Sequence, residues 1–194
     1  VRRETRTHPG AAAAIEHECA ACHMPMSRTQ AKAGGGMGRV FANLPAAPLP
    51  SDEAALAVDG VSCAMCHQIG KEKLGERESF SGGFVVDTAT PWGSRRIFGP
   101  HDVDAGRQRV MMSSSGFKPE MAEHIRSSEL CAACHTLYTH SLDEKGEVIG
   151  ELPEQVPYLE WKHSDYGGIQ GCPSCHMPEV EGEMPISSTL GQPR

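Results

Sequence analysis

The pattern Cys-x-x-Cys-His occurs four times in this chain and uses all eight of its cysteines. It is the attachment signature of a c-type haem, in which both cysteines become thioethers to the macrocycle and the histidine is the proximal iron ligand. The cysteines are Cys19 and Cys22 (first motif), Cys63 and Cys66 (second motif), Cys131 and Cys134 (third motif), and Cys172 and Cys175 (fourth motif). The proximal histidines are His23, His67, His135 and His176, in the same order. We therefore expect four covalent haems c, each with one iron, in a chain organised around the third motif.

Other uses of paired cysteines fit this pattern less well. A single Cys-x-x-Cys pair also suits a zinc site or thiol redox chemistry. Zinc ribbons, however, have no reason to place a histidine after every second cysteine, and disulfide staples would not keep one spacing throughout. The fourfold repeat with histidine therefore favours haem attachment over both alternatives.

The composition is thin in the residues that usually fill a protein core. Only 39% of the 194 residues are hydrophobic and 5% are aromatic, whereas Gly (21) and Pro (14) are plentiful. Four large apolar macrocycles would replace the missing core material. We expect a single tetrahaem domain over residues 1–194, a multihaem cytochrome c fold that is mainly coil with short helices and little β-structure. Residues 1–16 are expected to form an N-terminal arm, which is either a short helix or a segment that docks on a neighbouring subunit and frays without it.

Charge and hydropathy restrict the partners and the location. The formal net charge is -7, which argues against a nucleic-acid partner. The chain has no apolar run long enough to span a bilayer, so no transmembrane segment is expected. Covalent haem attachment indicates a periplasmic or extracellular protein.

Several local patterns predict secondary structure near the motifs. Residues 79–88 predict a short strand or hairpin that pairs with residues 95–98, and residues 31–53 predict loop and polyproline-like coil. Residues 154–163 predict a helix with Pro157 in its first turn, and Ser127 and Ser128 predict a cap for the third-motif helix. His-Met-Pro follows the first and fourth motifs alike, so the same turn should end both, and the last dozen residues predict a polar tail.

The second axial ligand of each iron decides between electron transfer and catalysis. An open sixth position permits small-molecule chemistry, whereas two strong ligands restrict the haem to electron transfer. Six histidines remain after the proximal ones, enough to complete all four irons. The expected distal ligands are His17, His101, His124 and His163, with His8 and His140 as secondary candidates for which a surface position is the alternative. His/Met ligation through Met24, Met26 or Met177 is a further alternative, although methionine beside haem more often packs than ligates.

Phrases around the motifs resemble the tetrahaem multihaem cytochromes, a group that includes the extracellular cytochrome nanowires of bacteria and archaea. The likeness extends from about His17 to Pro178, and a broader resemblance to the tetrahaem cytochromes of nitrogen-cycle respiration covers the same motifs. The residues that carry it are Gly60 to Cys63, Gly99 to Asp102, Glu129 to Cys131, His135 to Thr139, Pro157 to Trp161 and Cys175 to Pro178.

The nanowire resemblance implies subunits that polymerise head to tail, with two histidines on every haem and one of them donated by the adjacent subunit. His8 and His17 would be the donors in trans. We therefore expect electron transfer without substrate chemistry, in an extracellular conducting filament that passes electrons to redox proteins or extracellular acceptors. A soluble periplasmic shuttle to a terminal reductase is the alternative. An enzyme such as a nitrogen-oxide reductase needs a five-coordinate haem, and the surplus histidines argue against it.

Overall fold

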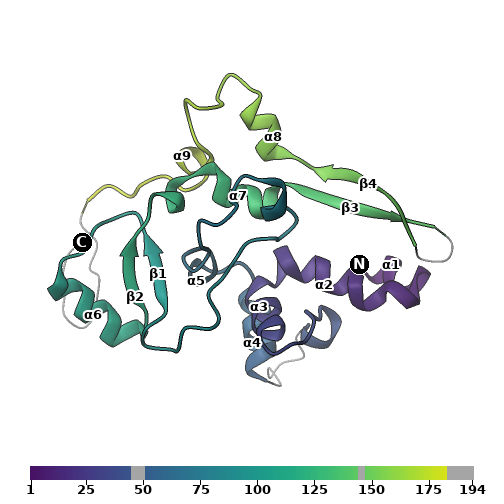
Figure 1. The fold of residues 1–194 in the computed structure, drawn as a ribbon, viewed down its shortest axis with the longest axis horizontal. Coiled ribbons are helices and arrows are strands. Elements are labelled where there is room, and N and C mark those ends of the chain that lie inside the picture. The colour runs from purple at the N-terminus through teal and green to yellow at the C-terminus, as the bar shows by residue number, and fades with distance from the viewer. Residues whose placement is uncertain (45–50, 144–146, 183–194) are drawn as a thin grey trace.

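The computed structural model describes residues 1–44, 51–143 and 147–182 (Figure 1). The expected polar tail at residues 183–194 lies outside these ranges, as do residues 45–50 of the expected proline-rich coil. The α-helices are α1 (Arg2–Thr7), α2 (Ala12–His23), α3 (Pro25–Ala33), α4 (Asp52–Asp59), α5 (Cys63–Cys66), α6 (Ala105–Ser115), α7 (Ser128–His135), α8 (Pro157–Lys162) and α9 (Cys172–His176). Short 3-10 helices lie at Pro9–Ala11, Phe41–Asn43, Arg77–Ser79 and Glu123–Arg126. The strands are β1 (Arg96–Gly99), β2 (Lys118–Met121), β3 (Leu137–Leu142) and β4 (Val148–Gln155).

The coarse prediction of short helices with little strand is confirmed, but the N-terminal third is more helical than expected. The arm forms α1, a 3-10 turn and the start of α2, where the run Ala11 to Ala14 favours helix. Of the alternatives for this arm, the structure has the short helix. The helix α3 also continues to Ala33, inside the segment predicted as loop, and it packs between α2 and α4.

Strands β1 and β2 pair in parallel, with Arg96 opposite Lys118, and α6 connects them (Figure 1). Parallel neighbours need such a crossover connection. The predicted hairpin at residues 79–88 is wrong, and so is its pairing with residues 95–98. Ser81 and Gly82 both have positive φ angles, which breaks any strand there, and a single bridge from Val86 to Ile69 is what this segment contributes.

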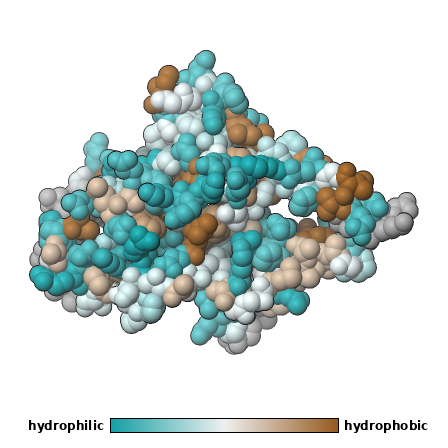
Figure 2. All heavy atoms as spheres, viewed as in Figure 1, coloured by the Kyte–Doolittle hydropathy of each residue, from teal (hydrophilic) through white to brown (hydrophobic). Residues whose placement is uncertain are grey.

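Strands β3 and β4 form an antiparallel hairpin that projects from α7 past the N-terminal helices (Figure 1). The sequence analysis did not predict it, although Leu137 to His140 contain the aromatic and β-branched residues typical of strands. Hydrophobic atoms lie near its far end in Figure 2, and Val148 and Ile149 at the start of β4 are exposed.

Two small apolar clusters hold the motif helices in place. One contains Met65 of the second motif, Ala133 of the third, and Ile69 and Phe84 from the chain after the second motif. The other contains Ala20, Met24 and Ala57, from α2, its end and α4. Within the described ranges, no helix combines the length and the apolar character needed to cross a bilayer.

The tyrosine and tryptophan side chains lie in different surroundings. Tyr158 is buried and packs between Phe80 and Trp161, with ring centroids 6.0 and 5.6 Å away. Tyr138 lies under the guanidinium of Arg77. By contrast, the side chains of Trp92 and Tyr166 are exposed.

Candidate haem attachment sites

All four motifs lie on helical turns. The first, third and fourth motifs end α2, α7 and α9, and the second forms α5 with His67 as its C-cap. Residues three apart on a helix share one face, so the two cysteines of each motif point to the same side. All eight cysteines are free thiols. This is the local geometry that attachment of one macrocycle to two thiols requires.

The first and fourth motifs end in the same turn, as the repeated His-Met-Pro predicted. Met24 has φ -137° and ψ 50°, and Met177 has φ -135° and ψ 59°. Both residues leave the helical region because proline follows, and proline disfavours helical geometry in the residue before it. The Met24 side chain is buried in an apolar cluster, whereas Met177 is exposed.

The first and third motifs pack closely together. Ala20, Ala21, Ala132 and Ala133, the residues between the cysteines, are all 0% exposed. Gly82 separates the two helices: its N–H donates to the carbonyl of Ala133 at 2.7 Å, and a Cβ added to it would lie 2.5 Å from the Cβ of Ala21. Alanine in the motifs and glycine at position 82 therefore permit this approach.

Thiols of the first, second and fourth motifs lie near the thiols of the third motif. Hydrogen bonding between Cys22 and Cys134 lowers the pKa of Cys22 and raises that of Cys134. Burial, followed by the nearby thiols of Cys172 and Cys66, raises the pKa of Cys131 to about 11. Burial likewise raises the pKa of Cys66. Cys66, Cys131 and Cys134 therefore hold their protons more tightly than an ordinary thiol does.

A hydrogen bond made by Ser128 joins the fourth motif to the third, whereas the sequence predicted that Ser127 and Ser128 cap α7. Ser127 is the N-cap of α7, but its side chain makes no capping hydrogen bond. The hydroxyl of Ser128 instead accepts the N–H of Cys172 at 2.9 Å. With the packing described above, this places the third motif next to the other three.

His67 has the hydrogen bond expected of a proximal ligand. Its Nδ1 lies 2.5 Å from the carbonyl oxygen of Phe98, and the N–H of Phe98 donates to the carbonyl of His67 at 2.7 Å. A carbonyl only accepts, so Nδ1 carries the proton and Nε2 keeps its lone pair for a metal. Free paired thiols and this tautomer fit a covalently attached haem.

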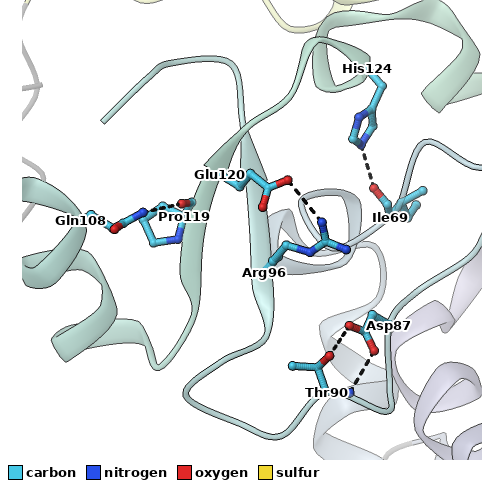
Figure 3. A network of polar contacts seen from close by, with 8 residues as sticks. All are labelled: Ile69, Asp87, Thr90, Arg96, Gln108, Pro119, Glu120 and His124. Atoms are coloured by element: carbon cyan, nitrogen blue, oxygen red, sulfur yellow. Dashed lines mark hydrogen bonds and ion pairs between the residues drawn. The ribbon is translucent and has the colours of Figure 1, made fainter. Parts of the chain in front are cut away.

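The structure brings one expected distal ligand, His124, to the second motif. Its Nε2 donates to the carbonyl of Ile69 at 2.8 Å, two residues after His67 (Figure 3). Its ring meets Phe98 edge-on, with centroids 5.0 Å apart. In the sequence, His124 comes shortly before the third motif. It lies near the second motif because β2, which precedes His124 in the chain, pairs with β1.

His17 is engaged by the backbone of the loop after α3. Its Nδ1 accepts the N–H of Gly38 at 2.8 Å, so its Nε2 carries the proton in the neutral ring. Burial, followed by the positive charge of Arg28, lowers its pKa and favours that neutral form. In this conformation His17 offers an N–H rather than a lone pair at Nε2.

The other candidate histidines have no side-chain hydrogen bond within the described residues. His8 is half-buried between α1 and the 3-10 turn, and His101, His140 and His163 are exposed. Among the proximal residues, His23, His135 and His176 are exposed too. The structure does not place His8, His101, His140 or His163 against a particular motif.

Four buried polar atoms near the motifs have no hydrogen-bond partner among the described residues: Ser27 Oγ, Arg28 Nε, Ser62 Oγ and Thr136 Oγ1. Ser62 and Thr136 flank the second and third motifs in the chain, and Ser27 and Arg28 lie on α3 after the first. Such orphaned groups usually mark a missing partner. The parts played by Arg28, Gly82 and Phe98 were not predicted from the sequence. Arg28 follows the first motif closely in the chain, whereas Gly82 and Phe98 lie far from any motif and carry no local signal.

Across residues 1–44, 51–143 and 147–182, no three His, Cys, Asp or Glu side chains converge into a protein-only metal site. Comparisons of the chain with known protein families, with curated proteins and with solved structures found no match.

Proposed function

We propose that this chain is an electron-transfer protein that carries four covalently attached haems c. The observation that supports it best is the arrangement of the motifs around α7. The third motif approaches the first through Gly82 and through the thiols of Cys22 and Cys134, and it shares an apolar cluster with the second and a hydrogen bond with the fourth. Cofactors attached at these places would be neighbours, as electron transfer between them requires.

The haems would supply the reversible one-electron chemistry of iron. The chain's own residues hold and orient them. Paired cysteines on one face of each helical turn fix each ring, and the His67–Phe98 hydrogen bond orients one proximal imidazole. Buried alanines and the cluster around Met65 and Ile69 keep water away from the contacts between motifs. Bis-histidine ligation by the proximal and distal histidines belongs to the same proposal and leaves no open iron for substrate.

The form we propose is an extracellular conducting filament, with one distal histidine donated by the next subunit. His8 is the better donor of the two arm histidines, because its ring has no partner within the described residues whereas His17 is held by Gly38. A periplasmic shuttle that stays monomeric is the alternative, and the state of assembly separates the two.

The intact mass and the haem content of the protein, produced with a cytochrome c maturation system, test the cofactor proposal. We expect the mass of the chain plus four haems, and a low-spin spectrum for all of them. A Cys131→Ser/Cys134→Ser variant should carry one haem fewer. A preparation that contains zinc or disulfides and no covalent haem would contradict the proposal.

A further inference from the structure

Arg28 is a buried cation with an incomplete set of partners. It lies on α3, just after the first motif, and its side chain is 9% exposed. One guanidinium nitrogen, Nη1, donates to the carbonyl of Gly82 at 3.2 Å, while the buried Nε has no partner. Within the described residues, no Asp or Glu forms an ion pair with it. A buried charge is costly unless it is paired and hydrogen-bonded. An anion bound next to Arg28 would therefore stabilise its buried charge.

Arg28 lies close to the contact between the first and third motifs. A Cβ added to Gly38 would be 2.8 Å from Cγ of Arg28 and 2.9 Å from Cβ of Ala20, so the Arg28 side chain lies near the first motif. Its partner Gly82 donates its own N–H to Ala133 of the third motif. An anion beside Arg28 would therefore lie next to the places where two haems attach.

Haem itself carries anions of suitable chemistry, because each macrocycle has two propionate carboxylates. A guanidinium presents donors in a planar fork that matches a carboxylate. We propose that Arg28 binds a propionate carboxylate of one of the haems attached at the first and third motifs. The inference rests on the proposed function, since it presupposes attached haem, and it adds a specific role for a residue outside the motifs.

The test compares Arg28→Gln, Arg28→Lys and Lys32→Gln in the haem-loaded protein. Lys32 is exposed one turn further along α3, so Lys32→Gln removes the same charge from the same helix. Haem content and the low-spin spectrum are measured first. If the unaltered protein carries no haem, the result contradicts the proposed function rather than this inference. Potentiometric titration and resonance Raman bands of the propionates then test Arg28.

In Arg28→Gln, an unpaired propionate should stabilise the ferric state of one haem. We expect its reduction equilibrium constant to fall about tenfold, a shift of about 59 mV for a one-electron couple, and its propionate bands to shift. Arg28→Lys should keep the potential within about threefold but shift the bands, because the charge stays and the fork is lost. If Arg28→Gln does not fold, Arg28→Lys still gives the band test.

Two results would overturn the inference. In one, the potentials and propionate bands of the Arg28 variants equal those of Lys32→Gln in protein with full haem content. In the other, added phosphate shifts a reduction potential of the unaltered protein but not of Arg28→Gln, and the propionate bands stay constant. Arg28 would then bind a free anion rather than a propionate.

Discussion

Gly82 shows how one residue sets the distance between two attachment sites. Its positive φ of 76° favours glycine, and any side chain would meet Ala21. The two motifs are evident in the sequence, but their proximity is not. The proximity of the two motifs depends on a turn at residues 81–82. This turn was not predicted, because residues 79–88 have a composition typical of a strand.

The first prediction is that Gly82→Ala is strongly destabilising. The left-handed backbone costs about 1 kcal/mol for alanine, and the clash with Ala21 adds about 1–3 kcal/mol by overpacking. Gly93 is the matched control, because its φ is 88° and a Cβ there would meet nothing within 4 Å. Denaturant unfolding of both variants should show a larger loss for Gly82→Ala, and equal losses would disprove the close packing.

Tyr158 gives a pH-dependent prediction. Burial, the charge of Glu129 and a 3.2 Å hydrogen bond to that carboxylate raise its pKa from 10.0 to about 12. The folded state therefore holds this proton more tightly than the unfolded state. The stabilisation is complete below pH 10 and is lost as the pH rises to about 12.

In the Tyr158→Phe variant, we expect a flatter decline of unfolding free energy between pH 10 and about 12. Loss of the hydrogen bond should cost about 1 kcal/mol at neutral pH. Tyr166→Phe, at an exposed position, serves as the control and should keep the alkaline decline of the unaltered protein. An identical slope in both variants would rule out a raised pKa for Tyr158.

At the scale of elements, the sequence predicted helices more accurately than strands. Pro157 is indeed in the first turn of α8, which ends at Lys162, but residues 154 and 155 of the predicted helix belong to β4 instead. Helix ends and motif turns depend on neighbouring residues, and so they can be predicted locally. The pairing of β1 with β2, and of β3 with β4, depends on distant partners that no local pattern identifies.

Ser127 and Ser128 allow a test of whether a local cap or a contact with a distant residue matters more. Ser128→Ala should loosen the fourth motif at a cost of about 1 kcal/mol, because the N–H of Cys172 loses its acceptor. Ser127→Ala should cost much less, since the Ser127 side chain makes no cap hydrogen bond. Hydrogen exchange at residues 171–176 should accelerate in the first variant alone, and a larger effect from Ser127→Ala would favour ordinary capping.

At the scale of the whole molecule, the four motifs predict four haems, and this stays a prediction. The arrangement of the motifs and the place of each candidate distal histidine depend on the fold, because a histidine far along the chain reaches a motif only through it. His124 illustrates this, since it comes to the second motif through β1 and β2.

Assembly is the whole-molecule prediction. Electron microscopy of the purified haem-loaded protein should show long unbranched filaments. His8→Ala should abolish them and convert about a quarter of the haem signal from low to high spin, because one iron of four loses a ligand. His140→Ala, at an exposed position in β3, is the control. Discrete particles at every concentration would favour the shuttle.

The contact between Cys22 and Cys134 also bears on how the protein is made. Before attachment, the two thiols belong to different motifs yet lie within hydrogen-bonding reach of each other. In an oxidising compartment such neighbours form disulfides readily. Under the proposed function, a cross-link here would disable the first and third motifs at once, so both cysteines would have to stay reduced until haem is attached. The close approach of the two motifs would then also be the point at which maturation fails most easily.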